Sequence, residues 1–280
     1  MKHLFNATKN FDKVSAMLSE EFFGVSKNRI ISQIKRGEVR INGVKIVSDC
    51  AVSIGDEVRI FLPESFSDKA TEVKIIYEDD NVLVVDKPVL CEVETHLVEI
   101  LKRQKDYDFI APSHRLDRNT TGLVVLAKSP QALEQLFNLF KHRKVQKFYK
   151  AEVVGKVKKQ QDSITVYFKK HSEKSFVSVS DVQRAGYMEA ITEYKVIKYF
   201  QDKDSTELEI KLITGRTHQI RATLAHIGHS IIGDGKYGSE KLNRLHKAPY
   251  QKLRAYKIIF DFENQDAPLL IKLKNKEISI

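Results

Sequence analysis

Cysteine is scarce in this sequence of 280 residues, which contains only Cys50 and Cys91. The two cysteines lie in unrelated segments, so they offer neither a disulfide framework nor a C-x-x-C metal pair. A chain without disulfides fits a reducing compartment, and this one is long enough to bury a large hydrophobic core. We therefore expect a cytoplasmic protein.

Long apolar segments are also absent. The first residues, MKHLFNATKNFDKVSAML, contain no apolar signal core, and no segment approaches the roughly 18 apolar residues of a membrane span. Internal repeats and low-complexity tracts are missing, and Gly233-Asp234-Gly235 does not make a phosphate-cradling loop of the nucleotide-binding kind. The sequence thus predicts no membrane partner and no nucleotide cofactor.

The sequence has no metal-binding motif such as H-E-x-x-H. Three histidines and an aspartate do lie in one short segment, and imidazole and carboxylate groups are suitable ligands for zinc or manganese. Such histidines more often cap helices, form hydrogen bonds or touch RNA, so we expect no metal at His218, His226, His229 and Asp234. Metal-dependent RNA hydrolysis is kept as a minor alternative.

Positive charge, by contrast, is in excess. The formal net charge is +10 at pH 7, while the hydrophobic content of 42% is ordinary for a globular protein. The distribution of the positive charge favours a polyanionic partner, because one cluster of cations contains a single acid, Glu38. The cluster consists of Lys27, Arg29, Lys35, Arg36, Arg40 and Lys45.

This basic cluster falls in a segment that is predicted to form a small module. The pattern predicts helices over Val14 to Phe23 and Lys27 to Arg36, and then a hairpin over Val39 to Val47 that turns at Asn42-Gly43. The stretch SKNRIISQIKRGEVRINGVKI resembles the RNA-binding module named for ribosomal small-subunit protein four, although NFDK stands where many relatives have R-L-D and a lysine. The resemblance implies phosphate contacts from Lys27, Arg29, Lys35, Arg36 and Arg40, and a solvated charged helix is the alternative.

A polar stretch, PESFSDKAT at residues 63–71, separates two regions of apolar patterning, as an interdomain linker does. We predict an RNA-binding module at residues 1–64, a linker at 65–72 and a catalytic domain at 73–280. In the second region strand signals outnumber helices, which indicates an α+β fold with a mixed, mainly antiparallel sheet. The predicted strands are Ile75 to Tyr77, Val82 to Val85, Leu123 to Ala127, Phe148 to Val154, Ile164 to Phe168, Ile191 to Ile197, Leu208 to Ile213 and Tyr256 to Phe260.

Two helices are predicted among these strands. The first begins at Ser129 and Pro130, and we expect Leu133, Phe137 and Phe140 to face the core. The second covers residues 217–227, ends at Gly228 and buries a stripe of apolar residues, while Gln219 and Thr223 lie elsewhere on its surface.

The chemically most suggestive stretch is HRLDRNTTGLVVLAK, residues 114–128. It places the carboxylate of Asp117 among His114, Arg115 and Arg118, and nearby positive charge favours the ionised form. An ionised carboxylate can attack carbon or orient a substrate. A structural role, in which Asp117 pairs with an arginine or caps a turn, is the alternative.

These fifteen residues resemble the signature of the RluA-type pseudouridine synthases. The resemblance implies that Asp117 is the catalytic aspartate that attacks the target uridine. It also implies that Arg115 helps hold this nucleotide flipped out of the RNA helix, and that His114 contacts the substrate. Chemistry on a base requires its removal from the stack, and a cation can stabilise the vacated space.

Three further segments extend the resemblance. The element KFYKA matches K-x-Y-x-A and implies a catalytic role for Tyr149 and substrate contact for Lys147; the element GRTHQIR implies that Arg221 pairs with the catalytic aspartate. Leu253, in a segment like the family's L-H-A step, is expected beneath the uracil. An ordinary strand tyrosine and an ordinary core leucine are the alternatives for Tyr149 and Leu253.

A basic run follows the first predicted helix, and we expect it to line an RNA cleft that leads to Tyr149. Its members are Lys141, Arg143, Lys144, Lys147 and Lys150, and a solvated charge run is the alternative. Together these resemblances imply a monomeric, cofactor-free RNA pseudouridine synthase that acts on large-subunit ribosomal RNA through a pseudouridine-synthase catalytic domain. The competing hypothesis is a non-catalytic RNA-binding or ribosome-assembly factor. The sequence leaves open whether Asp117 attacks the ribose or the base.

Overall fold

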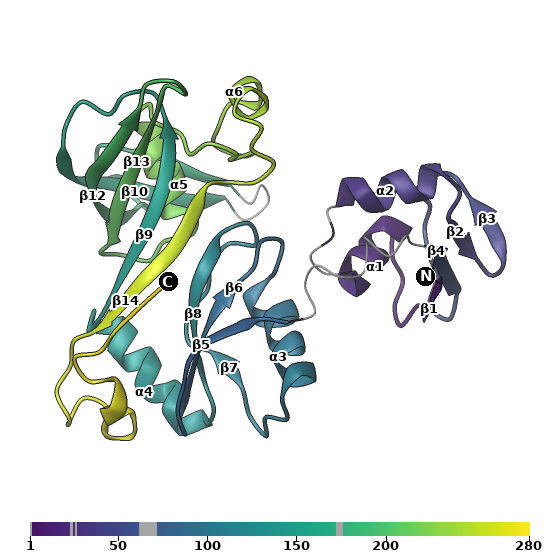
Figure 1. Ribbon diagram of the computed structural model, residues 1–280, viewed down its shortest axis with the longest axis horizontal. Helices are drawn as coiled ribbons and strands as arrows, with labels where there is room; N and C mark the ends of the chain where they lie inside the picture. The colour runs from purple at the N-terminus through teal and green to yellow at the C-terminus, as the bar shows by residue number, and fades with distance from the viewer. Residues whose placement is uncertain (1, 23–24, 26, 62–71, 172–175) are drawn as a thin grey trace. The chain divides into compact units, whose positions relative to one another are not determined.

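The computed structural model describes residues 2–22, 25, 27–61, 72–171 and 176–280 (Figure 1). The chain forms two compact units, Met1–Val73 with Leu90–Lys105 and Lys74–Val89 with Asp106–Ile280. The predicted linker lies almost entirely outside the described residues, and the domain limits remain a prediction. Within the described ranges, no helix is long and apolar enough to cross a membrane.

The first unit contains a four-stranded antiparallel sheet in the order β1-β4-β2-β3. The predicted hairpin is confirmed: Asn42 and Gly43 have positive φ angles of 50° and 81°, as the tight turn between two strands requires. Phe23, the predicted end of the first helix, lies outside the described residues. The elements are β1 Lys2–Asn6, α1 Val14–Glu21, α2 Lys27–Lys35, β2 Val39–Ile41, β3 Val44–Ile46, β4 Glu57–Phe61, η2 Val93–Leu97 and α3 Val98–Gln104.

One face of this sheet forms the core of the first unit. Val39, Val58 and Ile60 from the strands pack in one cluster with Leu18 of α1 and Ile34 of α2. Because side chains alternate along a strand, the residues between these point to the opposite face. The two helices therefore cover the face that carries the apolar residues.

The second unit is built on a large sheet in the order β11-β10-β12-β13-β9-β14-β8-β6-β5, with β15 paired to β14 and β7 to β8. All pairs are antiparallel except β14 and β8, which run parallel. This confirms the predicted α+β class with a mainly antiparallel sheet. The strands are β5 Lys74–Glu78, β6 Val82–Lys87, β7 Ala111–Pro112, β8 Thr121–Ala127, β9 Val145–Val154, β10 Gln161–His171, β11 Phe176–Ser180, β12 Met188–Phe200, β13 Ser205–Leu212, β14 Leu253–Phe260 and β15 Glu277–Ser279; the helices are α4 Pro130–Lys141, α5 Gln219–His226, α6 Glu240–Leu245 and η4 Pro268–Leu273.

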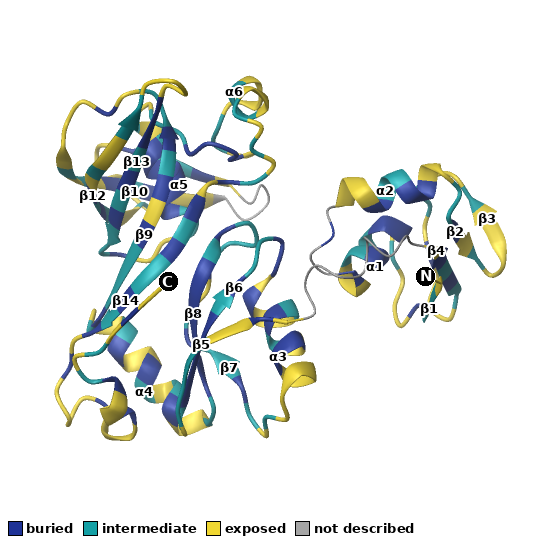
Figure 2. Ribbon diagram, viewed as in Figure 1, coloured by how far each residue is buried: buried dark blue, intermediate teal, exposed yellow. Residues whose placement is uncertain are grey.

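Strand β8 is buried along almost its whole length, as Figure 2 shows, and α4 packs beside it. The predicted cap of α4 is confirmed, because the Ser129 hydroxyl accepts a hydrogen bond from the Ala132 amide. The predicted core stripe was wrong for Phe137, which is 50% exposed. Ala132, Leu136 and Leu139 form the buried stripe, and Phe137 lies about 130° from its centre at about 100° per residue.

Helix α5 is shorter than predicted, because His218 adopts a left-handed conformation with φ of 55° and the helix begins at Gln219. Gly228, with φ of 85°, follows the helix end as expected. The helix is buried on more than one side: Gln219 and Thr223, predicted to lie away from the core, are both buried. This wide burial brings polar side chains of α5 into the interior.

Candidate active site

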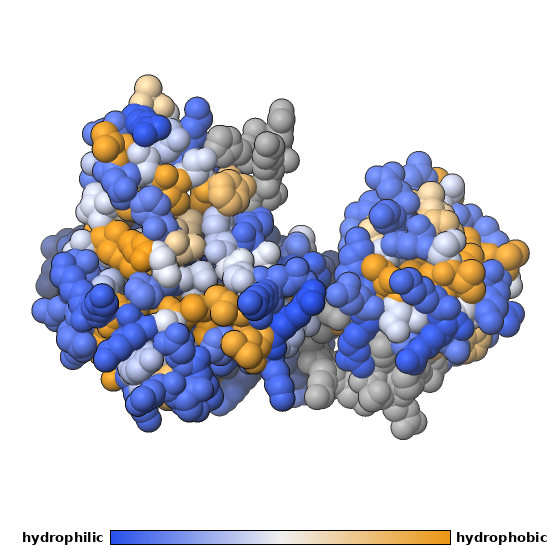
Figure 3. Space-filling view, turned by 90° about the horizontal axis from the view of Figure 1, so that it is seen from above, coloured by the Kyte–Doolittle hydropathy of each residue, from blue (hydrophilic) through white to orange (hydrophobic). Residues whose placement is uncertain are grey.

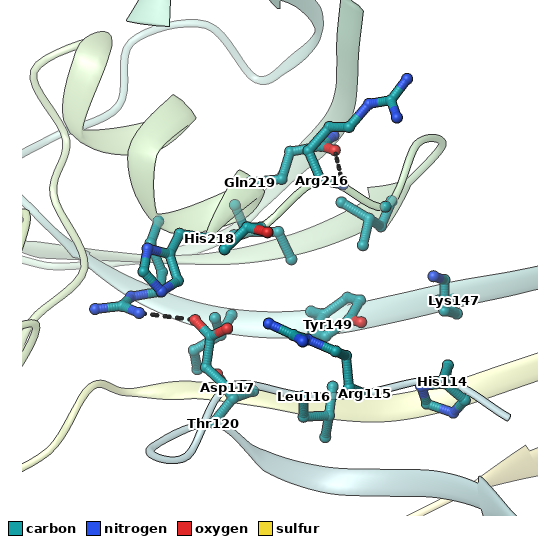
Figure 4. Close-up of a pocket in the computed structure, with 16 residues that line it drawn as sticks. His114, Arg115, Leu116, Asp117, Thr120, Lys147, Tyr149, Arg216, His218 and Gln219 are labelled. Atoms are coloured by element: carbon teal, nitrogen blue, oxygen red, sulfur yellow. Dashed lines mark hydrogen bonds and ion pairs between the residues drawn. The ribbon is translucent and has the colours of Figure 1, made fainter. Parts of the chain in front are cut away.

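The residues predicted to be catalytic meet in one pocket of the second unit, with a volume of about 280 Å³ (Figure 4). Three parts of the chain line it: the loop before β8, the turn that leads into α5, and strand residues that form the floor. The lining residues include His114, Arg115, Leu116, Asp117, Thr120, Lys147, Tyr149, Leu212, Gly215, Arg216, Thr217, His218, Gln219, Ile220, Arg221 and Leu253. The sequence separation between these parts shows that the pocket is made by the fold.

Asp117 lies on a loop whose backbone is fixed from several sides. The amide of Thr120 donates to the carbonyl of Asp117 at 2.9 Å, which closes a tight turn. The fully buried Lys87 donates from Nζ to the carbonyls of Arg118 at 3.1 Å and of Pro88 at 3.0 Å. Gln251 donates to the hydroxyl of Thr120 at 2.5 Å. The loop that carries Asp117 is thus tied to β6 and to the segment before β14.

The backbone just after this loop requires a glycine, Gly122. Its φ is 111°, and a Cβ atom there would lie 2.0 Å from the carbonyl oxygen of Ala255. At this point β8 begins its parallel pairing with β14, where Ala255 is the partner of Gly122. Any side chain would push the two strands apart directly beside the Asp117 loop.

Arg221 holds the Asp117 carboxylate. Its Nη1 donates to Oδ2 of Asp117 at 2.7 Å. Its Nε and Nη2 donate to the two oxygens of Asp234 at 2.7 and 2.9 Å, a bidentate arrangement that fixes the plane of the guanidinium. Arg221 therefore bridges two carboxylates, of which Asp234 is fully buried and Asp117 faces the pocket.

Electrostatics keep this bridge charged. Burial alone would lower the pKa of Arg221, but the hydrogen bonds and charges of Asp234 and Asp117 raise it above its ordinary value. Burial would raise the pKa of Asp234, yet its hydrogen bonds from Arg221 and from the amides of Tyr237 and Lys236 hold it below the usual range. Arg221 and the buried carboxylate of Asp234 are thus both charged at neutral pH.

Tyr149 belongs to the floor of the pocket. It lies on β9, where it pairs with Ile210 of β13 and Ala255 of β14, and it is only 4% exposed. Burial, reinforced by the charge of Asp117, raises the pKa of Tyr149 above its ordinary value, so the phenol is neutral. Leu253 follows on β14 and faces the same pocket. The floor therefore presents a flat ring and an aliphatic side chain.

Lys147 lies two residues before Tyr149 on the same face of β9. Its Nζ is 5.6 Å from the centroid of the Phe140 ring, and the described residues include no carboxylate paired with it. Burial lowers the pKa of Lys147 to about 8, so the ammonium is charged at neutral pH but loses its proton more easily than an exposed lysine. An anionic group in the pocket would find this cation available.

The geometry agrees with comparisons to known proteins. The profile of a family described as RNA pseudouridylate synthase matches residues 81–226. A protein of Aquifex aeolicus described as an uncharacterized RNA pseudouridine synthase is 34% identical over 250 residues, which cover 81% of this chain and 77% of that protein. The chain belongs to the RNA pseudouridine synthase family.

Two further comparisons agree with this result, the first in sequence and the second in fold alone. Ribosomal large subunit pseudouridine synthase C of Buchnera aphidicola is 30% identical over 262 residues, covering 86% of this chain and 82% of its own. The solved structure of human RNA pseudouridylate synthase domain containing 1 matches with a TM-score of 0.65 and 21% identity over 79% of this chain and 86% of that chain. The predicted enzyme class, an isomerase that forms pseudouridine in RNA, is confirmed at this level.

The surroundings of His114 keep its imidazole neutral. Its Nε2 accepts a hydrogen bond from the amide of Val125 at 3.1 Å, and burial, with the charge of Lys147, lowers the pKa of His114 to about 3. The imidazole is therefore neutral and carries its proton on Nδ1, which has no hydrogen-bond partner within the described residues. It lines the pocket beside the Phe140 ring, and its role as a substrate contact remains a prediction.

The three histidines considered as metal ligands have separate partners in the synthase. His218 contacts the Tyr237 hydroxyl at 2.9 Å, His226 contacts Asp181 at 2.8 Å, and His229 contacts the carbonyl of Val154 at 3.0 Å. Across the part of the chain that the structure describes, no group of three or more histidine, cysteine or acidic residues could hold a metal ion. Asp234, the fourth residue of that set, accepts hydrogen bonds from Arg221 at both carboxylate oxygens.

Arg115 and the predicted RNA-binding cations lie at the surface. Arg115 is exposed and lines the pocket, and its contact with the flipped nucleotide stays a prediction. Hydrophilic side chains cover much of the face seen in Figure 3, as expected when 30% of residues are charged. The exposed cations of the prediction are Lys27, Arg29, Lys35, Arg36, Arg40 and Arg143.

The basic run after α4 points in more than one direction. Lys144 is half-buried and lies 3.7 Å from Asp266, and Lys150 is on the opposite face of β9 from Tyr149, because their positions differ by one residue. Lys147 of the run lines the pocket. The RNA cleft expected from the run as a whole, with RNA contacts by Arg143 and Lys144, stays a prediction.

Several residues that shape the site were not predicted from the sequence. Asp234 was considered only as a metal ligand, and no role was assigned to Lys87. Gln219 joins the turn before α5 to β12, because its amide donates to the Ile191 carbonyl and accepts from the Thr214 hydroxyl. The sequence around Asp234, GDGKYG, does not reveal that this carboxylate binds Arg221.

Proposed function

We propose that this synthase converts uridines of large-subunit ribosomal RNA to pseudouridine, with Asp117 as its catalytic carboxylate. One observation supports this most directly: Arg221 binds Oδ2 of Asp117, while Oδ1 has no partner within the described residues and faces the pocket. A carboxylate that is fixed at one oxygen and free at the other can attack or stabilise a reacting carbon.

The reaction needs no second substrate, because uridine and pseudouridine are isomers. Asp117 attacks the flipped uridine at the ribose or the base, the bond between C1′ and N1 breaks, and the uracil turns. A bond then forms between C1′ and C5, the bond between Asp117 and the nucleotide breaks and returns the free carboxylate, the C5 proton is lost and N1 gains a proton. Atoms and electrons balance without a redox partner, so we propose that the synthase uses no cofactor.

In this proposal the remaining pocket residues bind and orient the flipped nucleotide. Tyr149 and Leu253 form an apolar floor for the uracil, and the neutral phenol adds a hydroxyl that forms no hydrogen bond within the described residues. Lys147 supplies a cation for a phosphate or a uracil carbonyl. Arg115 stays at the rim and stabilises the space that the flipped nucleotide leaves.

The choice of RNA rests on the relatives and on charge. Ribosomal large subunit pseudouridine synthases C and D are similar to this chain, the latter at 33% identity for the protein of Xylella fastidiosa over 83% of this chain. The net charge of +10 favours a polyanion. We further propose that the synthase acts in the cytoplasm as a monomer, with the exposed cations of α2 and Arg143 and Lys144 contacting RNA phosphates.

The test is a map of pseudouridine in transcripts of large-subunit ribosomal RNA incubated with wild-type protein or with Asp117→Asn. The asparagine keeps the shape of the side chain and removes its charge, so folding should be retained. Asp181→Asn is the matched control, because that aspartate is exposed and contacts only His226. We expect site-specific pseudouridine with wild type and the control, and none with Asp117→Asn.

Other outcomes separate the alternatives. If the Asp117→Asn protein modifies RNA at the wild-type rate, Asp117 is not catalytic. If wild-type protein binds the transcripts tightly but modifies neither these nor assembled particles, the non-catalytic binding factor is the better description. If the RNA is shortened only when metal is supplied, metal-dependent RNA hydrolysis is the better description.

A further inference from the structure

His218 lines the catalytic pocket at the turn that leads into α5. Figure 4 shows its ring and the Asp117 carboxylate towards one end of the pocket, with His114 and Lys147 towards the other. The charge of Asp117 acts on the pKa of His218, which agrees with their closeness. The imidazole therefore lies where the carboxylate is proposed to meet the nucleotide.

Tyr237 fixes the orientation and the tautomer of this imidazole. Its hydroxyl oxygen lies 2.9 Å from Nδ1 of His218 and accepts a hydrogen bond from the amide of Val177 at 3.3 Å. The hydroxyl has a single hydrogen to donate, and Nδ1 is the acceptor in its reach among the described residues. The proton of the neutral imidazole is then on Nε2.

Several contacts hold Tyr237 in place. Its ring stacks on the Phe176 ring with 5.3 Å between centroids, and the guanidinium carbon of Arg221 lies 5.3 Å from its centroid. Its amide donates to Oδ1 of Asp234 at 3.0 Å, and this carboxylate also binds Arg221. The tyrosine that holds His218 is thus tied to the bridge that orients Asp117.

The imidazole of His218 is neutral at neutral pH. Burial lowers the pKa of His218 below its ordinary value. The charges that act on it are those of Arg221 and Lys236, which also lower the pKa, and those of Asp117 and Asp234, which raise it. With Nδ1 used by the tyrosine, the ring presents one polar group to the pocket, the Nε2–H donor, and this donor has no acceptor within the described residues.

The reaction creates a negative charge that such a donor can stabilise. When the bond between C1′ and N1 breaks, its electron pair stays on the uracil, and attack of Asp117 on the base also moves electrons into the ring. In both routes the carbonyl oxygens of the uracil share this charge until C1′ and C5 are joined. A donor that is fixed in advance and aimed at developing charge lowers the barrier, and a neutral imidazole can serve as one.

We propose that His218 is a further catalytic residue, whose Nε2–H donates to a carbonyl oxygen of the uracil while the ring is negatively charged. Tyr237 is the positioning residue that holds this donor. No proton is transferred in this step, because the imidazole keeps its hydrogen throughout. The inference rests on the proposed function, since it assumes that Asp117 and the uridine react in this pocket. A structural role for His218 at the start of α5 is the competing explanation.

The test compares His218→Asn with wild type in single-turnover reactions on an RNA that the wild-type protein modifies. His218 has a left-handed backbone with φ of 55°, which asparagine also tolerates, so folding should be retained while the shorter amide does not reach the position of Nε2. We expect the rate of cleavage between C1′ and N1 to fall by about a hundredfold. The affinity for RNA, measured by anisotropy, should stay close to that of wild type, because the donor acts on charge that exists only during the reaction.

Two further variants complete this comparison. His218→Gln carries an amide donor that reaches further, so it should recover part of the lost rate. His226→Asn is the matched control, because His226 lies on the same helix and contacts the exposed Asp181. The control should react like wild type.

Replacement of the target uridine by 5-fluorouridine distinguishes a donor from a structural residue. Fluorine withdraws electrons and stabilises the negative ring, so loss of the donor should slow this nucleotide less than uridine. A displaced loop would slow both nucleotides equally. Tyr237→Phe keeps the ring beside Arg221 and removes the hydroxyl, so it should show the same preference with a smaller loss of rate.

The outcomes separate this inference from the proposed function. A wild-type rate for folded His218→Asn would overturn the inference, and so would equal losses with both nucleotides and no recovery with His218→Gln. If Asp117→Asn is active, or if ribosomal RNA is not the substrate, the proposed function fails, while the effect of His218 is still measured on the RNA that the enzyme modifies. If the wild-type protein modifies no RNA, both fail.

Discussion

Arg221 in the catalytic unit and Arg40 in the N-terminal unit are the same residue type in opposite surroundings. Arg221 is 8% exposed and donates to two carboxylates, whereas Arg40 is exposed and has no acidic partner within the described residues. A buried guanidinium is tolerated only when its charge and its donors are satisfied by the protein. An exposed guanidinium keeps its hydration and stays available to a ligand. Burial thus separates cations that organise the enzyme from cations that can meet RNA.

The strongest test of this difference is Arg221→Ala. The substitution leaves Asp234 buried without its bidentate partner, so we expect the free energy of unfolding to fall by about 3–5 kcal/mol. Pseudouridine formation should fall by at least about a hundredfold, because Asp117 loses the donor that orients it. Urea denaturation and single-turnover modification measure the two effects.

Arg184→Ala is the control for that experiment, since Arg184 is exposed and should tolerate the change. The combined variant Arg221→Met and Asp234→Leu sharpens the result by removing the buried charges together. It should recover stability but not activity. Equal stability of wild type and Arg221→Ala would contradict the role assigned to the bridge.

A smaller loss of stability and of activity is expected for Lys87→Met. The methionine fills a similar volume but leaves the carbonyls of Pro88 and Arg118 without the Nζ donor, at a cost of about 1–3 kcal/mol for each. Because Arg118 follows Asp117, kcat should fall together with stability. Thermal unfolding and steady-state rates give the comparison, with the exposed Lys74→Met as control. A stable protein with wild-type kcat would show that Lys87 does not position the loop.

Lys147 is intermediate between the two classes and should respond to pH. Burial lowers its pKa to about 8, so the ammonium is charged below that pH and neutral above it. If the cation binds substrate, KM is lowest below pH 8 and rises by up to about tenfold for each pH unit above it. Lys147→Arg keeps its charge across this range and should flatten the profile. Parallel KM profiles for both proteins would exclude Lys147 as the titrating group.

The smallest effect is expected for exposed cations such as Arg36→Ala. No buried group loses a partner, so the unfolding midpoint should stay within experimental error. The affinity for RNA should fall by a few-fold, and the fall should shrink as salt increases. Thermal melting and binding titrations at two salt concentrations test this. A large loss of stability would mean that exposure does not separate the two kinds of cation.

Local sequence signals predicted much of the fold. The Asn42-Gly43 turn, the Ser129 cap and the alternating or continuous apolar strands all depend on neighbours in the chain, and the structure has them. The failures have equally local reasons. Phe137 was assigned to the core from its helical spacing with Leu133 and Phe140, but the buried stripe is centred one position earlier in the chain. The start of α5 was set too early because nothing in the sequence shows that His218 is left-handed.

The residues of the site were predicted through a resemblance, whereas the contacts that hold those residues in place were not predicted. The resemblance paired Arg221 with Asp117, and the structure places them in contact at 2.7 Å although they lie 104 positions apart. Asp234, Lys87 and Gln251 act through contacts that depend on the folded sheet. Neither periodicity nor charge pattern reports such contacts, because a buried carboxylate and an exposed one look the same in a sequence.

The position of β14 determines when the synthase becomes active during its own synthesis. In the sheet order this strand lies between β9 and β8 and is the link between the strands on either side. Asp117 precedes β8, whereas Tyr149 and Arg221 belong to the other side, and β14 is formed by residues 253–260. A nascent chain on the ribosome can thus hold all three side chains and still lack an active site. We therefore expect the active site to form only after β14 has left the ribosomal tunnel.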